Sequence, residues 1–257
     1  MGAGVPGTLV GAGRSADVYD LGNGRVLRRY RDRRPPERVA AEAEAEVMAC
    51  ARRFGVPVPE VLEVSGPDIV MERVDGPTMV EAIGRRPWTG GAQVRSLARL
   101  HELVHRVPAS GLALPPFGPA GDRDGDVLLH RDLHPQNVIL AAGGPMIIDW
   151  ESAARGPAAA DIAMTWAIIT FSDIPGSRLE AVVLAGVRAL LTRSFLRAAG
   201  PLDETWRTLA VQRRLAEPHV LPSEAARMRR WSTASPSPAS GSPASGSAAT
   251  GSPDASG

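Results

Sequence analysis

The chain has 257 residues, of which 44% are apolar and 22% charged, and its formal net charge is +1. This balance is ordinary for a globular protein and gives no electrostatic reason to expect a nucleic-acid or membrane partner. Cys50 is the only cysteine, which excludes an intrachain disulfide and a cysteine-rich zinc site. Because no signal-peptide pattern begins the chain and no apolar run reaches the roughly 20 residues that span a bilayer, we expect a cytoplasmic protein.

The N-terminal region is expected to be rich in β-structure. Short apolar runs separated by glycine-rich turns, at Gly11/Gly13 and at residues 22–24, are typical of antiparallel strands. A helix is expected over residues 37–54, where it would follow two prolines and end at a glycine. The expected strands are residues 5–10, 16–21, 25–30, 58–64 and 69–73.

The pattern becomes helical after residue 76. Helices are expected over 79–83 and 93–105 and over most of 158–231, and three short buried strands are expected at 127–129, 138–140 and 146–148. Residues 232–257 contain only Ser, Ala, Pro, Gly, Thr and one Asp, a composition that cannot bury an apolar face and predicts a disordered tail. We therefore expect a β-rich lobe over 1–73, a larger helical lobe over 74–231 and a tail over 232–257.

The stretch HRDLHPQNVIL, residues 130–140, carries the strongest chemical signal. Its Asp132 and Asn137 fit a kinase catalytic loop, in which the aspartate accepts the proton of an attacking hydroxyl and the asparagine binds Mg²⁺. Asp149 follows an apolar strand, and a tight hairpin turning at residues 143–144 would bring it to Asn137. The sequence therefore predicts Asp132 as the catalytic base and Asn137 and Asp149 as metal ligands. An ordinary polar turn and a two-metal site that includes His130 and His134 are weaker alternatives.

Two other motifs allow competing interpretations. HELVH, residues 101–105, matches the zinc pattern H-E-x-x-H, but no third ligand is evident nearby, so a partly solvated helix end is the simpler interpretation. Gly11 and Gly13 suggest a dinucleotide-binding loop, yet a strand follows them where that motif needs a helix. They can instead form a turn between strands that approaches phosphates, or a plain hairpin turn.

The motif HRDLHPQNVIL, followed by IIDWESAARGPAAADIA, resembles the aminoglycoside phosphotransferase and choline kinase-like family. The resemblance runs in order over about residues 7–231 and includes GAGRSADVY, GRVLRRY and LARLHEL, the last of which weakens the zinc interpretation. It implies an α+β fold of the two-lobed protein-kinase-like type, with ATP or GTP, Mg²⁺ and transfer of the γ-phosphoryl group to a hydroxyl of a small-molecule acceptor. The resemblance also implies that Asp161 braces the catalytic loop and that the backbone of Met71, Glu72 and Arg73 binds the purine.

The chain departs from the family at the phosphate-binding lysine. All 29 of its basic residues are arginine, so no lysine can hold the α- and β-phosphates. Arg28 is the best replacement, because strand alternation places it on the same face as Val26, and Arg29 is the alternative if the register slips. Its acidic partner is expected to be Glu44, with Glu42 and Glu46 as rivals.

A second departure concerns Arg131, which stands where the family usually has glycine. It is expected to be structural or to provide a second phosphate-facing charge, and the short segment between Asp149 and Asp161 leaves no room for a phosphorylated activation loop.

Residues 171–231 hold six acids and ten arginines, which weakens the expectation of a polycationic aminoglycoside as acceptor. A catalytically inactive, nucleotide-binding protein is the second hypothesis, and its only support is the missing lysine.

Overall fold

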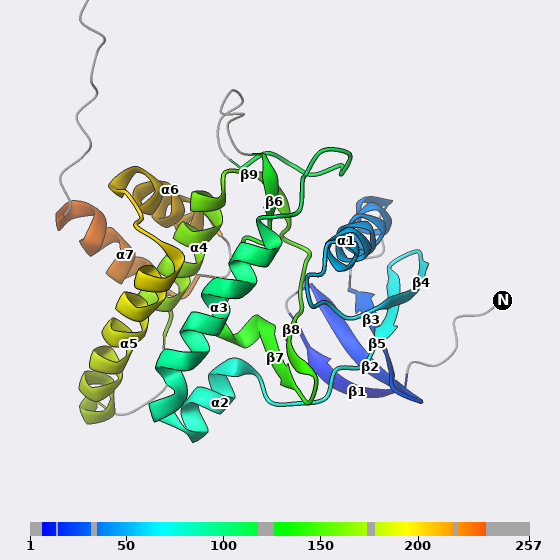
Figure 1. The fold of residues 1–257 in the computed structure, drawn as a ribbon, viewed down its shortest axis with the longest axis horizontal. Helices are drawn as coiled ribbons and strands as arrows, with labels where there is room; N and C mark the ends of the chain where they lie inside the picture. The colour runs from blue at the N-terminus through cyan, green and yellow to red at the C-terminus, as the bar shows by residue number, and fades with distance from the viewer. Residues whose placement is uncertain are drawn as a thin grey trace, which may run out of the picture.

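The computed structural model describes residues 7–13, 15–31, 35–117, 126–173, 178–217 and 220–234. Figure 1 shows an N-terminal sheet with one helix beside it and a C-terminal part that is mostly helical. The expected α+β arrangement, with a β-rich part preceding a helical part, is confirmed. No helix among the described residues has both the length and the apolar character needed to cross a membrane.

The N-terminal sheet has five strands in the order β1-β2-β3-β5-β4, and every neighbouring pair is antiparallel. The β2–β3 turn has positive φ at Gly22, Asn23 and Gly24, which explains the two glycines there. The strand expected over 58–64 begins later, because Pro57 and Pro59 lack the N–H groups that a ladder needs. The strands are β1 (Thr8–Ala12), β2 (Ala16–Gly22), β3 (Arg25–Tyr30), β4 (Val61–Ser65) and β5 (Asp68–Glu72).

Helix α1 (Pro35–Arg53) packs against this sheet through an apolar face. Ala41, Ala45, Met48 and Ala51 recur at three- and four-residue intervals and are buried, as expected for an amphipathic helix. Glu44 lies on the same face and is also buried. A buried carboxylate needs partners, so this residue is a first sign of a functional or structural ion pair.

The C-terminal part contains six α-helices among the described residues, and short strands connect them. β6 pairs with β9, and β7 pairs with β8 to form a hairpin that Figure 1 shows between the sheet and the helices. β9 was not expected, because three residues without an apolar run leave no strand signal. The helices are α2 (Met79–Arg85), α3 (Gly90–Val104), α4 (Ala158–Phe171), α5 (Arg178–Ala199), α6 (Glu204–Leu215) and α7 (Pro222–Ala234). The short strands are β6 (Val127–Leu129), β7 (Val138–Ala141), β8 (Gly144–Ile147) and β9 (Ala154–Gly156).

Packing is continuous across the expected boundary between residues 73 and 74. One core cluster includes Met71 of β5, Met79 of α2 and Trp150, and a second cluster surrounds α4. The boundary itself therefore stays a prediction. Helix α7 extends to Ala234, so the first three residues of the expected tail are helical, and residues 235–257 lie outside the described part of the chain.

Candidate active site

A cleft of about 1060 Å³ is lined by the N-terminal sheet, α1 and the segments that flank the β7–β8 hairpin. Every residue predicted for the site lines this one cleft, although the residues come from positions 11 to 149 of the chain. They are Gly11, Gly13, Arg28, Glu44, Met71, Glu72, Arg73, Asp132, Asn137 and Asp149. The fold thus brings together the residues predicted to bind the nucleotide and the metal and to act as the base.

The loop between β6 and β7 positions Asp132. The Asn137 Nδ2 donates to the main-chain oxygen of Asp132 at 2.9 Å and to its Oδ2 at 3.1 Å, while His134 Nε2 lies 3.5 Å from its Oδ1. Burial favours the neutral acid, but the hydrogen bond with His134 and the positive charges of His134, His130 and Arg214 together outweigh it and hold the pKa of Asp132 below its usual value. The carboxylate is therefore ionised at neutral pH and can accept a proton.

The β7–β8 hairpin forms as expected and brings Asp149 towards the catalytic loop. Its pairs run from Val138 with Ile147 to Ala141 with Gly144, and the N–H of Ile148 donates to the main-chain oxygen of Asn137 at 3.0 Å. Asp149 is the next residue and has a positive φ of 67°. A non-glycine residue in this conformation is strained, and such strain is often found at functional sites.

Arg28 is the arginine of β3 that faces the cleft. Its Nε lies 3.3 Å from Glu44 Oε2, and its Nη2 lies 2.8 Å from Asp149 Oδ1 and 2.7 Å from Glu151 Oε2. Arg29 instead pairs with Asp68 on the other face of the strand, at 2.5 Å. Burial alone would lower the pKa of Arg28, but the carboxylates of Glu44 and Asp149 raise it above its ordinary value, so the guanidinium stays charged.

Glu44, rather than Glu42 or Glu46, reaches Arg28, because the two rivals lie on the exposed side of α1. Tyr30 Oη donates to Glu44 Oε2 at 2.7 Å, and the Trp150 N–H donates to its Oε1 at 3.0 Å. Burial raises the pKa of Glu44, and the charge of Arg28 opposes that shift. Glu44 thus joins β3, α1 and the segment that follows β8.

Two further residues join this network without having been predicted. The Ser15 Oγ donates to Glu151 Oε2, which connects the β1–β2 turn to the segment after Asp149. Glu151 also binds Arg28. The position of Glu151 within the motif IIDWE is the signal that could have identified it, whereas a serine in a turn carries no such signal.

Of the two glycines predicted here, Gly11 lies in β1 and Gly13 in the β1–β2 turn, and only Gly13 is required for reasons of space. The Gly13 N–H donates to the Ala16 oxygen at 2.8 Å, and a Cβ at Gly13 would lie 2.9 Å from that oxygen. A Cβ at Gly11 would instead make an ordinary contact with Val18, at 3.7 Å. Gly13 is therefore explained by a close backbone approach, and Gly11 lines the cleft without a steric requirement.

In the predicted purine-binding segment, two amide N–H groups are already engaged, and purine binding by this segment stays a prediction. The N–H groups of Glu72 and Arg73 donate to the main-chain oxygens of Glu60 and Gly24, both at 2.9 Å. These two amides complete the end of the sheet and are not free to bind a purine. Val74 follows them and also lines the cleft.

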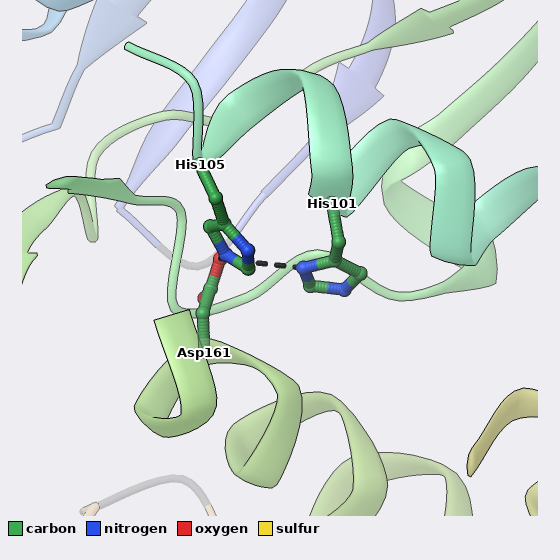
Figure 2. A group of neighbouring side chains, drawn as sticks. All are labelled: His101, His105 and Asp161. Atoms are coloured by element: carbon green, nitrogen blue, oxygen red, sulfur yellow. Dashed lines mark hydrogen bonds and ion pairs between the residues drawn. The ribbon is translucent and has the colours of Figure 1, made fainter. Parts of the chain in front are cut away.

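Asp161 lies in the first turn of α4, buried beside His101 and His105 (Figure 2), and from there it supports the loop that follows β6. It accepts the N–H of Arg131 at 2.6 Å and the N–H of His130 at 3.2 Å. His105 Nε2 and His101 Nδ1 lie 3.1 and 3.4 Å from its Oδ2. Burial disfavours the charged form, but the two histidines outweigh it and hold the pKa of Asp161 well below its usual range.

The same cluster corrects the expectation that no third ligand lies near the two histidines of this helix end. His101 is only 1% exposed, and the donor atoms of His101, His105 and Asp161 all lie within 4.8 Å of one another. The oxygens of Asp161 are, however, already engaged by the catalytic loop, and Glu102, the base that a zinc protease would need, is exposed. The two histidines therefore support the loop after β6 indirectly, because they hold the Asp161 carboxylate that binds its backbone.

Comparison with known proteins agrees with this geometry. A family model described as the phosphotransferase enzyme family matches residues 7–125 and 112–200. A probable bifunctional tRNA threonylcarbamoyladenosine biosynthesis protein of Methanoculleus marisnigri is 30% identical over 149 residues, which are 54% of this chain and 24% of the relative. A probable serine/threonine-protein kinase BUD32 homolog of Archaeoglobus fulgidus is 27% identical over 129 residues, which are 49% of this chain and 53% of the relative.

The chain thus spans about a quarter and about half of the lengths of these two curated relatives. Among solved structures, the streptomycin-ATP-APH(2")-IIa ternary complex superimposes with a TM-score of 0.60 and covers 88% of each chain at 12% identity. At that identity the likeness shows the kinase-like fold, which confirms the expected fold class. The family match extends over most of the chain and includes the catalytic-loop segment, so the chain belongs to the phosphotransferase enzyme family.

Proposed function

We propose that this phosphotransferase transfers the γ-phosphoryl group of ATP to a hydroxyl of a small-molecule acceptor. The observation that carries the proposal is the ionised Asp132, held by Asn137 in the same cleft as Arg28 and Asp149. A protein that only bound a nucleotide would have no use for a carboxylate fixed in this way. We expect the enzyme to act in the cytoplasm, where ATP is available as co-substrate.

Asp132 would act as the general base. The acceptor oxygen attacks the γ-phosphorus, a new P–O bond forms, the bond to the β-phosphate oxygen breaks and ADP leaves, while the hydroxyl proton passes to Asp132. Because the pKa of Asp132 lies below its usual value, the residue starts this step in the ionised form. The Asn137 amide keeps the carboxylate oriented, so positioning is the main contribution of the loop.

Asn137 and Asp149 are the residues that would hold Mg²⁺. The donor set fits this ion, because a carboxylate and an amide oxygen are hard oxygen ligands and Mg²⁺ prefers them. Bound Mg²⁺ would neutralise charge on the phosphate oxygens. The Asn137 Nδ2 is committed to Asp132, which leaves the amide oxygen as its available ligand atom.

Arg28 would take the place of the usual lysine on the α- and β-phosphates. Its guanidinium can bind phosphate through two N–H groups and keeps its charge. In the described structure the same Nη2 contacts Asp149 and Glu151, so nucleotide binding requires Arg28 to exchange these partners while Glu44 keeps its place. The purine would lie against residues 71–74, where Val74 is the first residue that can offer an N–H not used at the end of the sheet.

An assay of ATP consumption with a panel of hydroxyl acceptors tests the proposal. Purified protein should release ADP in a Mg²⁺-dependent and acceptor-dependent manner, and Asp132→Asn should abolish that release while retaining nucleotide binding. Arg229→Ala is the matched surface control, because Arg229 is exposed on α7. If the protein binds a nucleotide but consumes none with any acceptor, the inactive, nucleotide-binding alternative is correct.

A further inference from the structure

The Arg131 side chain lines the cleft beside Asp132, and among the described residues no carboxylate lies within ion-pair distance of its guanidinium. Within the described ranges, no carboxylate or carbonyl accepts a hydrogen bond from its guanidinium, and its Nε is buried without a partner. Its Cζ lies 5.7 Å from the centroid of the Phe117 ring. Burial and repulsion from Arg213 lower the pKa of Arg131, and the carboxylates of Glu217, Asp161 and Asp132 offset only part of this shift.

The backbone of Arg131 points to a use for this side chain. Its φ is 67°, a left-handed conformation that is strained for a residue with a Cβ. The Arg131 N–H donates to Asp161 Oδ1 at 2.6 Å, so the core holds the loop in this conformation. A glycine would occupy the position without strain, and therefore the side chain, rather than the fold, accounts for an arginine here.

A second cation lies close by. The Arg213 Cζ lies 5.1 Å from the same Phe117 ring, and Arg213 has no ion pair within the portion of the chain that the structure describes. Because both guanidinium groups contact the same ring, their charges are close together, and Arg213 lowers the pKa of Arg131 by repulsion. An anion bound near Arg131 would offset the free-energy cost of burying this charge. It would also reduce the repulsion between Arg131 and Arg213.

The acids of the helical region are already engaged. Asp203 caps α6, and the others whose side chains the structure describes between residues 171 and 231 make ion pairs with arginines. These pairs are Glu204 with Arg207, Glu217 and Glu224 with Arg214, and Asp173 with Arg227. Binding a polyamine here would require breaking such pairs, whereas binding an anion would not.

We propose that the acceptor of this phosphotransferase carries an anionic group, a carboxylate or a phosphate, and that Arg131 binds that group next to the hydroxyl that is phosphorylated. This inference rests on the proposed function and narrows its substrate class to hydroxy acids and phosphorylated alcohols. The acceptor anion would pair with a guanidinium that makes no hydrogen bond to the described residues and whose Nε is buried without a hydrogen-bond partner. Arg131 thus acts as a specificity-determining residue, with Arg213 adding to the positive potential.

A binding experiment with the full chain tests the inference without needing the natural acceptor. The protein is saturated with Mg²⁺ and AMP-PNP, so that the γ-phosphate position is filled, and its Tm is measured with glycerol, glycerate, glycerol 3-phosphate or ethanolamine. Glycerate and glycerol 3-phosphate should raise the Tm of the wild type, and glycerol and ethanolamine should not. The absence of any shift with both anionic probes overturns the proposal.

Two variants assign the effect to Arg131. Arg131→Gly restores the residue typical of the family and relieves the backbone, so it should fold with a Tm close to that of the wild type and lose the response to the anionic probes. Arg229→Ala removes the same charge from the exposed face of α7 and should keep that response. An equal anion response in Arg131→Gly overturns the proposal.

The nucleotide provides a separate readout. AMP-PNP alone should shift the Tm of the wild type and of Arg131→Gly equally. If Arg131→Gly loses the AMP-PNP shift and keeps the anion shift, the arginine serves the nucleotide phosphates and the proposal is overturned. A wild type that ignores AMP-PNP contradicts the kinase function itself, so the two failures can be told apart.

Discussion

Replacing Asp161 by Asn tests whether the catalytic loop depends on a buried carboxylate. Asp161 Oδ1 accepts the Arg131 N–H at 2.6 Å, and its Oδ2 accepts the His130 N–H at 3.2 Å and lies 3.1 Å from His105 Nε2. An amide has one accepting oxygen, so either orientation turns its NH₂ group towards a buried N–H. At least one charge-assisted hydrogen bond is lost and one donor is left unsatisfied, which costs about 3 kcal/mol.

This loss is large enough to measure. For a domain of this size each kcal/mol lowers Tm by about 2–4 °C, so Asp161→Asn should unfold roughly 6–12 °C below the wild type when followed by circular dichroism. The control is Asp126→Asn, because Asp126 pairs with Arg155 at the surface and should lose about 1 kcal/mol or less. If the two variants lose the same stability, the loop does not depend on Asp161.

The pH dependence of this difference has a definite sign. Asp161 has a lower pKa in the folded chain than its ordinary value of 3.8, so its contribution to stability is fully present above that value. The contribution is lost as the pH falls through the still lower pKa of the folded state. The stability gap between the wild type and Asp161→Asn should therefore be constant around neutral pH and shrink only in acid.

Four variants at three positions of the cleft have separate expected outcomes. Asp132→Asn should lower kcat by about 10²–10⁴-fold because the general base is lost, with nearly unchanged nucleotide affinity by calorimetry; a normal kcat would refute the base assignment. Asp149→Asn should remove the Mg²⁺-dependent part of ATP binding, measured with and without a chelator, and undiminished dependence would exclude Asp149 as a ligand. Arg28→Ala should destabilise the protein by about 3 kcal/mol in urea unfolding, because Glu44 is left buried without its cation, whereas Arg28→Lys should lose less. Equal losses in the two Arg28 variants would contradict the pairing with Glu44.

Local patterns were sufficient to predict much of the site. The spacing of Asp132, Asn137 and Asp149 predicts a loop and a short hairpin. The structure has both: Asn137 bonds to Asp132 within the loop, and β7 pairs with β8 in the hairpin. The choice of Arg28 over Arg29 followed from the alternation of side chains along a strand, because one face of β3 meets Glu44 and the other meets Asp68. These inferences depend on residues that are close in sequence or fixed by a two-residue period.

Contacts between distant segments could not be predicted in the same way. The hydrogen bond from Ser15 to Glu151 joins residues 136 positions apart, and neither residue has a local pattern that identifies its partner. The approach of Asp161 to His101 and His105 depends on the tertiary packing of α3, so the sequence did not reveal the third member of this cluster. The amides of Glu72 and Arg73 are used by the end of the sheet, which only the strand pairing reveals.

Arg28 of β3 also determines which reagents can modify the cleft. An ammonium group loses its proton in alkaline solution and can be acetylated, whereas a guanidinium does neither under the same conditions. Acyl-phosphate nucleotide probes, which label kinases by acylating an amine near the phosphates, should therefore leave Arg28 unmodified. A labelling survey of cell extracts with such probes would overlook this protein even if its cleft binds ATP.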